Sequence, residues 1–243
     1  MTRSTRPDFD HVSEPLDQRV ATGLHKLGLA LKHRTWALAH AQGLSPTQGQ
    51  ILTALASDGP LSASEVASRL GVSLPTVSDA VATLVAKRLA RKATDPRHPR
   101  ARLLHLTTTG ARRAATARTW PDFLAPALGT LSDGEQTVLL MALMKMIRTL
   151  QEQGQIPTSR MCATCVHFRP HAHDGALPHH CAFIDAAMAE RHLRLECPEH
   201  TVAPPDQQHA AWARLTHALV DHTRRNLPRR HARTGGGATA GGR

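Results

Sequence analysis

The sequence contains no tyrosine, and aromatic residues make up only 3% of its 243 residues. It also lacks any apolar run of about 18 residues, the length from which a membrane-spanning helix becomes a candidate. The first residues, MTRSTRPDFDHVSEPL, are polar and lack the apolar segment of a secretory signal peptide. We therefore expect a cytoplasmic protein without a membrane partner.

Cysteine is absent from the first 161 residues, yet four cysteines follow in the pattern C-x2-C-x15-C-x15-C. They are Cys162, Cys165, Cys181 and Cys197. In the cytoplasm, clustered cysteines are more often metal ligands or redox groups than structural disulfides. Thiols that bind no metal, free or paired, are the less favoured alternative.

Acidic residues are scarce relative to basic ones, at 19 against 30, which gives a net charge of +11. Such a surplus favours a polyanionic partner, usually nucleic acid and less often an anionic membrane. The sequence shows no nucleophile with a matching base and no nucleotide-binding loop. An enzyme or electron carrier is therefore the least favoured class, and we expect a protein that is not an enzyme.

Composition and hydrophobic periodicity divide the chain into five regions. They are a disordered N-terminus (1–13), a helical domain with a hairpin (14–155), a cysteine-rich module (156–200), a helix (201–227) and a disordered basic tail (228–243). Ile156-Pro157 marks the start of the module. The predicted fold class is mainly α with a small β-hairpin.

Within the helical domain, two short helices are predicted on either side of Gly71. Ser62 and Glu65 form a capping-box pattern for the first helix, and Ser73 can cap the second. An earlier helix starts in the same way, with Ser45 as N-cap and a proline in its first turn. Two short helices joined by a tight turn with glycine are typical of a helix-turn-helix. The predicted buried face of the second helix is Val77, Val81, Leu84 and Val85.

After the second helix come two short, partly alternating runs, LARKAT and ARLLHLT, around DPRHPR. The two prolines exclude a helix there, so we predict a β-hairpin, or wing. Helices are predicted next at 107–118 and 132–153. The latter is apolar over more than one face, which indicates either a core helix or a subunit interface.

Residues 44–112 resemble the MarR family of winged helix-turn-helix regulators. The resemblance is carried by LSPTQ at the opening, PTVS at the start of the second helix, DPRHPR in the wing and LTTTG at its exit. With flanking helices it extends over residues 14–155. It implies a homodimer that shares the 132–153 helix between subunits and binds a pseudo-palindromic double-stranded operator. Each recognition helix would enter a major groove and each wing a minor groove.

The residues predicted to contact DNA lie on the outward face of the recognition helix and on the wing. They are Ser73, Pro75, Thr76, Ser78, Asp79, Thr83, Arg91, Lys92, Arg97, Arg100 and Arg102. Thr76 and Ser78 can donate to phosphates or bases, and Arg97 and Arg100 stand at the wing tip. Asp79 departs from the basic residue usual in the family. It reads a C·G pair, makes the helix sit shallower, or pairs within the monomer.

The four cysteines admit two metal centres. Zinc prefers four tetrahedral thiolate or imidazole ligands, but the second CxxC of a zinc ribbon is missing. A 4Fe–4S cluster takes four thiolates whose positions are further apart, and the spacing is similar to that of high-potential iron–sulfur proteins. We favour the cluster slightly, with zinc as the alternative. The module's histidines would then line a polar shell, and a short helix is predicted at about 185–196.

We thus expect a homodimeric DNA-binding transcriptional regulator that is modulated by its metal centre. The alternative is a repressor that responds to a small-molecule effector, as family members often do, with a purely structural metal. Comparing operator affinity with and without the metal separates the two hypotheses.

Overall fold

The computed structural model describes residues 13–95 and 98–226, without the side chains of 217–226. The chain divides into two compact units, Met1–Thr158 and Ser159–Arg243. The boundary lies three residues after the one predicted before Ile156, and the cysteine-rich segment shares a unit with the C-terminal helix. None of the described helices has the length and apolar character needed to cross a bilayer.

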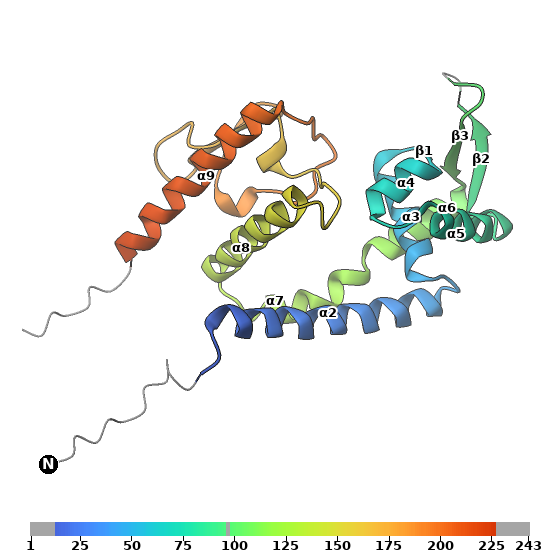
Figure 1. The fold of residues 1–243 in the computed structure, drawn as a ribbon, viewed down its shortest axis with the longest axis horizontal. Helices are drawn as coiled ribbons and strands as arrows, with labels where there is room; N and C mark the ends of the chain where they lie inside the picture. Colours follow the sequence, from blue (N-terminus) through green and yellow to red (C-terminus); the bar gives the residue numbers. More distant parts are fainter. Residues whose placement is uncertain (1–12, 96–97, 227–243) are drawn as a thin grey trace, which may run out of the picture. The chain divides into compact units, whose positions relative to one another are not determined.

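The first unit is mainly helical and carries a three-stranded antiparallel sheet of order β1-β3-β2 (Figure 1). Its helices are α2 (Leu16–Ala41), α3 (Pro46–Asp58), α4 (Ala63–Leu70), α5 (Leu74–Ala86), α6 (Thr108–Arg118), the 3-10 helix η1 (Trp120–Leu124), α7 (Ala125–Leu128) and α8 (Asp133–Glu152). Its strands are β1 (Leu61–Ser62), β2 (Ala90–Thr94) and β3 (Arg102–Leu106). The predicted wing is confirmed as the β2–β3 hairpin.

The helix starts predicted from serine are confirmed. The Ser45 and Ser62 hydroxyls each accept from the backbone N–H three residues on, and both sites form a complete capping box. The Ser73 hydroxyl accepts from the Thr76 N–H at 3.3 Å. Gly71 ends α4 with φ of 65°, a left-handed conformation in which glycine carries no steric cost. These local bonds satisfy backbone groups that the helix itself leaves without partners.

The core of the first unit lies where α3, α4 and α5 meet the sheet. Its members include Ile51, Leu52, Val66, Val77, Val81, Leu84, Leu104 and Trp120. The prediction for α5 is confirmed at three of four positions. It is wrong at Val85, which is 36% exposed because it follows Leu84 by one residue and points away from the buried stripe.

Helix α5, the wing and α6 meet at one junction, where hydrogen bonds connect them. After α5, Arg88 adopts a positive φ of 57°, and Leu89 donates its N–H to the Leu84 carbonyl at 2.9 Å. The Thr107 hydroxyl donates to the Arg88 carbonyl at 2.8 Å and accepts from the Gly110 N–H. A Cβ on Gly110 would lie 1.9 Å from the Leu89 carbonyl oxygen, so this close approach requires glycine. The LTTTG motif therefore has a structural reason.

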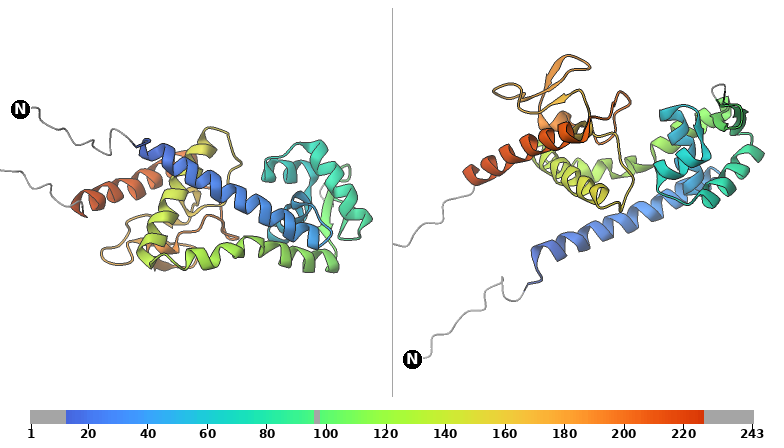
Figure 2. Two further views of the ribbon diagram at one scale, coloured as in Figure 1. Left: turned by 90° about the horizontal axis from the view of Figure 1, so that it is seen from below. Right: turned by 45° about the horizontal axis from the view of Figure 1, so that its top comes forward.

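Helix α2 buries very little of itself within the described chain. Ala39 is its one buried residue, while Leu16, Val20, Leu27 and Trp36 are each about half exposed or more. Both views in Figure 2 show the N-terminal part of α2 extending away from α3 to α6. Helix α8 is two-sided: its buried residues are Met141, Met144 and Arg148, and its exposed apolar residues include Val138, Leu139 and Met146.

The second unit is built from short elements and one long helix. They are η2 (Cys162–Thr164), β4 (Phe168–Arg169), β5 (His179–Cys181), β6 (Ala186–Met188), η3 (Glu190–His192) and α9 (Pro205–Asn226). The three strands form an antiparallel sheet of order β4-β5-β6. Helix α9 lies against η2, with Ala211 and Leu215 buried.

The helix predicted at about 185–196 is wrong. Asp185 has a positive φ of 50° and turns the chain, so that Ala186–Met188 returns along β5 as strand β6. Glu190–His192 then forms only a single 3-10 turn. The alanine- and glutamate-rich run has helical propensity, but pairing with β5 overrides it, since propensity is a weak preference.

Candidate functional site

Helix α5, the predicted recognition helix, exposes the face that the sequence predicted. Ser73, Pro75, Thr76, Ser78 and Asp79 are all exposed. Two of the predicted DNA contacts already contact each other, because the hydroxyls of Ser73 and Thr76 lie 2.8 Å apart. The Ser73 hydroxyl also accepts from the Thr76 N–H, and since a hydroxyl carries one proton and two lone pairs, each of the two can still make a further bond.

Thr83 and Asp79 differ from one another in their surroundings. The Thr83 hydroxyl donates to the Asp79 carbonyl at 3.1 Å, and Thr83 is only half-exposed. The Asp79 carboxylate makes no hydrogen bond or ion pair with any residue in the described part of the chain. Pairing within the monomer, one of the three alternatives for Asp79, is therefore not seen there. A charge that points into solvent is free to meet a base edge or to be repelled by phosphate.

The wing carries its basic residues on two faces. In the β2–β3 register, Lys92 is opposite Leu104, and Arg91 is opposite His105. Since neighbouring strand residues point to opposite faces, Lys92 shares a face with the buried Leu104 and Arg91 does not. Arg102 lies two residues before Leu104 and so shares the face of Lys92.

At the wing tip, Arg100 is exposed, and the Asp95 N–H donates to the Ala101 carbonyl at 3.0 Å. The predicted contact Arg97 lies outside the described residues. The tip hairpin therefore presents Arg100 beside a closed backbone turn.

Two basic residues at the end of α5 were missed by the sequence reasoning. Lys87 donates its Nζ to the Gly43 carbonyl and to Gln48 Oε1, so it closes the start of α3 rather than facing solvent freely. Arg88 is exposed next to the wing. Its signal in the sequence was the AKRLAR run, in which basic residues continue from the helix into the strand.

The second unit brings the four cysteines to one cavity of about 290 Å³. They come from four separate places: η2, the turn after it, the end of β5 and the loop before α9. All four are free thiols of intermediate exposure. The cavity is otherwise mainly apolar, with Phe168, Phe183, Ile184, Ala187 and Met188 among its lining residues. Spacing in the sequence alone did not show that the segments enclose a space.

The arrangement of the thiols bears on which centre they could hold. Among the described residues, no three Cys, His, Asp or Glu side chains come close enough to hold a single metal ion. Tetrahedral zinc with Zn–S bonds of about 2.3 Å would need sulfurs about 3.8 Å apart. The four thiols line one cavity.

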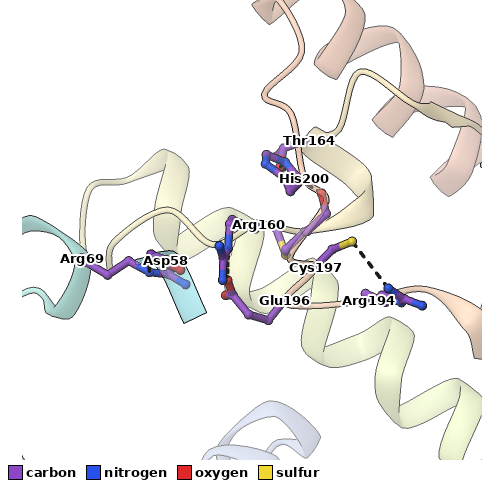
Figure 3. A network of polar contacts seen from close by, with 9 residues as sticks. Asp58, Arg69, Arg160, Thr164, Arg194, Glu196, Cys197 and His200 are labelled. Carbon is purple, nitrogen blue, oxygen red and sulfur yellow. Dashed lines mark hydrogen bonds and ion pairs between the residues drawn. The ribbon is translucent and has the colours of Figure 1, made fainter. Parts of the chain in front are cut away.

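Arg194 contacts two of the four sulfurs. Its backbone N–H donates to Cys162 Sγ at 3.3 Å, and its guanidinium Nη1 donates to Cys197 Sγ at 3.6 Å (Figure 3). Burial raises the pKa of Cys162 to about 11, with the Arg194 N–H opposing the shift and the other three cysteines adding to it. Four thiolates together in this cavity therefore require a compensating positive centre.

The histidines do not form one shell around the cavity. Of the module's seven, only His167 and His192 line it. His179 is fully buried elsewhere, with Nδ1 accepting from the His171 N–H at 3.2 Å, and burial lowers its pKa to about 4. His173 and His180 pair at 3.3 Å, and burial lowers the pKa of His200, whose Nε2 contacts the Thr164 hydroxyl. The predicted histidine shell is therefore wrong for most of its members.

The comparison with protein families gives a match over the helix-turn-helix and most of the wing. Residues 42–101 match the model of the MarR family. The match spans α3 to the wing tip and leaves the cysteine-rich unit outside it. A comparison with curated proteins found no match to this chain.

Solved structures similar to this chain include MarR itself. The MarR apo form from E. coli is 19% identical, covers 55% of this chain and 97% of its own, and has a TM-score of 0.46. The YusO protein from Bacillus subtilis is 22% identical and has a TM-score of 0.46. The match covers 56% of this chain and 99% of YusO. MepR from S. aureus, in a complex with DNA, is 23% identical and has a TM-score of 0.47. The match covers 54% of this chain and 97% of MepR.

Proposed function

We propose that this protein is a sequence-specific, homodimeric DNA-binding transcriptional regulator. The observation that carries the proposal is the exposed polar face of α5 beside a basic hairpin, in a chain with a net charge of +11. An exposed helix with short hydroxyl side chains suits a major groove, and the wing arginines suit the phosphates and the minor groove. The MarR family match over residues 42–101 supports the same function.

The homodimer is supported by the exposed apolar faces of α2 and α8. Trp36 is 56% exposed and Val138 72% exposed, and an apolar groove of Leu16, Val20, Ala21, Leu24 and Met146 lies between the two helices. A 26-residue helix with one buried side chain gains little from its own unit. A second copy that covers these faces would supply the missing burial and place two recognition helices on one operator.

The DNA-binding proposal is tested by removing wing charges one at a time. Arg100→Ala and Arg102→Ala should each weaken operator binding and lower the slope of log affinity against log salt by about 1. Arg19→Ala, an exposed arginine on α2, is the matched control and should leave the slope unchanged. Wild-type slopes in both wing variants would refute phosphate contact by the wing.

We infer further that the four thiolates hold a 4Fe–4S cluster, with zinc as the alternative, and that this centre modulates DNA binding. The cavity, which all four cysteines line, supports a shared centre with four thiolate ligands. When bound, the cluster would supply one-electron redox chemistry, with Cys162, Cys165, Cys181 and Cys197 as ligands. Modulation is supported by chain order, since Cys162 follows the end of α8 by ten positions.

The cluster is tested by anaerobic purification with iron, sulfide and zinc analysis. About four iron and four sulfide per chain are expected, with loss of both in Cys181→Ser. One zinc per chain without iron would overturn the cluster. Operator affinity is then compared between the loaded and the metal-free protein, and equal affinities would leave the metal with a structural role and favour a small-molecule effector.

A further inference from the structure

We propose that Arg194 tunes the reduction potential of the centre by contacts to two of its four thiolate ligands. This inference rests on the proposed 4Fe–4S cluster and goes beyond it, because it assigns a regulatory property to one side chain outside the ligand set. Arg194 is a positioning and tuning residue here, and it is not a ligand.

The backbone holds Arg194 against the thiol loop from both sides. The Cys162 N–H donates to the Arg194 carbonyl at 3.0 Å, while the Arg194 N–H donates to Cys162 Sγ at 3.3 Å. The Cys197 N–H donates to the Arg160 carbonyl at 3.0 Å. An ion pair from Arg160 to Glu196 fixes the neighbouring residue of the same loop (Figure 3). These bonds place the start of the Arg194 side chain independently of the guanidinium.

The guanidinium then reaches the second sulfur. Its Nη1 lies 3.6 Å from Cys197 Sγ, within hydrogen-bond range for sulfur, and Arg194 also lines the cavity. One residue thus gives Cys162 a neutral donor and Cys197 a charged donor. Guanidinium remains protonated at every working pH, so this contact is a fixed positive charge.

The direction of the effect follows from where the added electron goes. If a cluster held by these thiolates accepted one electron from an external donor, it would gain one negative charge, shared with the thiolate sulfurs, and no bond would be formed or broken. Hydrogen bonds and positive charge at these sulfurs stabilise the reduced form more than the oxidised form. The Arg194 contacts therefore raise the midpoint potential and make the centre easier to reduce.

The experiment is a potentiometric titration of the loaded, full-length protein with dye mediators, followed by visible absorption. Arg194→Gln removes the charge and should lower the midpoint potential. Arg194→Lys keeps the charge but loses the planar donor, so its midpoint potential should lie between those of the wild type and Arg194→Gln. Arg191→Gln is the matched control, because Arg191 is exposed three residues earlier and does not line the cavity. It should keep the wild-type potential.

The dependence of the midpoint potential on ionic strength distinguishes an electrostatic role of Arg194 from a purely structural one. Arg194 is exposed, so its charge is screened, and the gap between wild type and Arg194→Gln should narrow as salt rises from about 0.05 to about 0.5 M. If Arg194→Gln fails to assemble the cluster, Arg194→Lys against Arg191→Gln carries the comparison.

The outcomes separate this inference from the proposed function. Wild-type protein with zinc and no iron overturns both. Wild-type protein with a full cluster, together with unshifted potentials in Arg194→Gln and Arg194→Lys, overturns the role of Arg194 alone. An equal shift in Arg191→Gln also overturns it, since the effect would then be one of overall charge.

Discussion

The first unit buries one continuous apolar cluster, from Ala39 to Trp120, that joins its helices to its sheet. The second unit buries fewer large side chains, such as Met161, Phe168 and Leu215, and its strands have only two or three residues each. Each fully buried large apolar side chain contributes about 1.5–3 kcal/mol, so apolar burial is the main stabilising contribution in the first unit. The second unit instead surrounds a cavity with four thiols. If the proposed centre fills that cavity, its binding would contribute to the folding of this unit.

The sharpest way to break this comparison is to remove one ligand. We expect Cys181→Ser to abolish binding of the centre and to release backbone amides of residues 159–216 to fast hydrogen exchange, because ligand binding and folding are coupled there. Residues 44–118 should keep their protection. The control is Ala182→Ser, which adds a serine at the exposed neighbouring position without removing a thiol. Full protection of both units in Cys181→Ser would mean that the second unit folds without its centre.

The opposite result is expected from Gly110→Ala. Its Cβ would meet the Leu89 carbonyl oxygen, and a clash with backbone should destabilise the first unit by about 4 kcal/mol. Denaturant unfolding followed by hydrogen exchange measures it, and the second unit should keep its centre. Gly134→Ala in α8 has open space around the new Cβ and should be neutral or stabilising. A neutral Gly110→Ala would disprove the close approach.

A pH titration should single out the second unit. Burial lowers the pKa of His179 from 6.5 to about 4, so the unfolded chain takes up the proton first as pH falls. The stabilisation from neutral His179 is therefore full above pH 6.5 and is lost between pH 6.5 and 4, by at most about 3 kcal/mol. Thermal unfolding of wild type and His179→Gln should show a difference that changes across this window. A constant difference would contradict the buried neutral imidazole.

The smallest effect is expected at a helix cap. Ser73→Ala removes the hydroxyl that accepts from the Thr76 N–H, which should cost the first unit about 1 kcal/mol. Ser78→Ala is the control, because Ser78 is exposed inside the same helix and alanine favours helix there. Equilibrium unfolding in urea compares the two. Equal stabilities would show that the Ser73 cap contributes nothing.

The first unit was predicted well from the sequence because its helix starts and its wing depend on local sequence signals. The caps at Ser45, Ser62 and Ser73 and the proline-limited wing each depend on a few neighbouring residues. The split of Arg91 and Lys92 between two faces was not predicted, because it depends on strand register.

In the second unit, the sequence predicted that the four cysteines share a site, but it did not predict how the segment folds. The four cysteines were enough to predict a shared site. The turn at Asp185 and the sulfur contacts of Arg194 depend on pairing between distant segments, which composition and spacing do not report.

The junction of Arg88, Leu89, Thr107 and Gly110 limits how this protein could be switched. Helix α5, the wing and α6 meet there through backbone and hydroxyl hydrogen bonds, and the contact at Gly110 is too close for any Cβ. We therefore expect the three elements to move as a single rigid body. Bending the hairpin relative to the helix would break several of these bonds at once. In the proposed homodimer, a signal would therefore change the distance between two such bodies, and so favour operators by the separation of their half-sites.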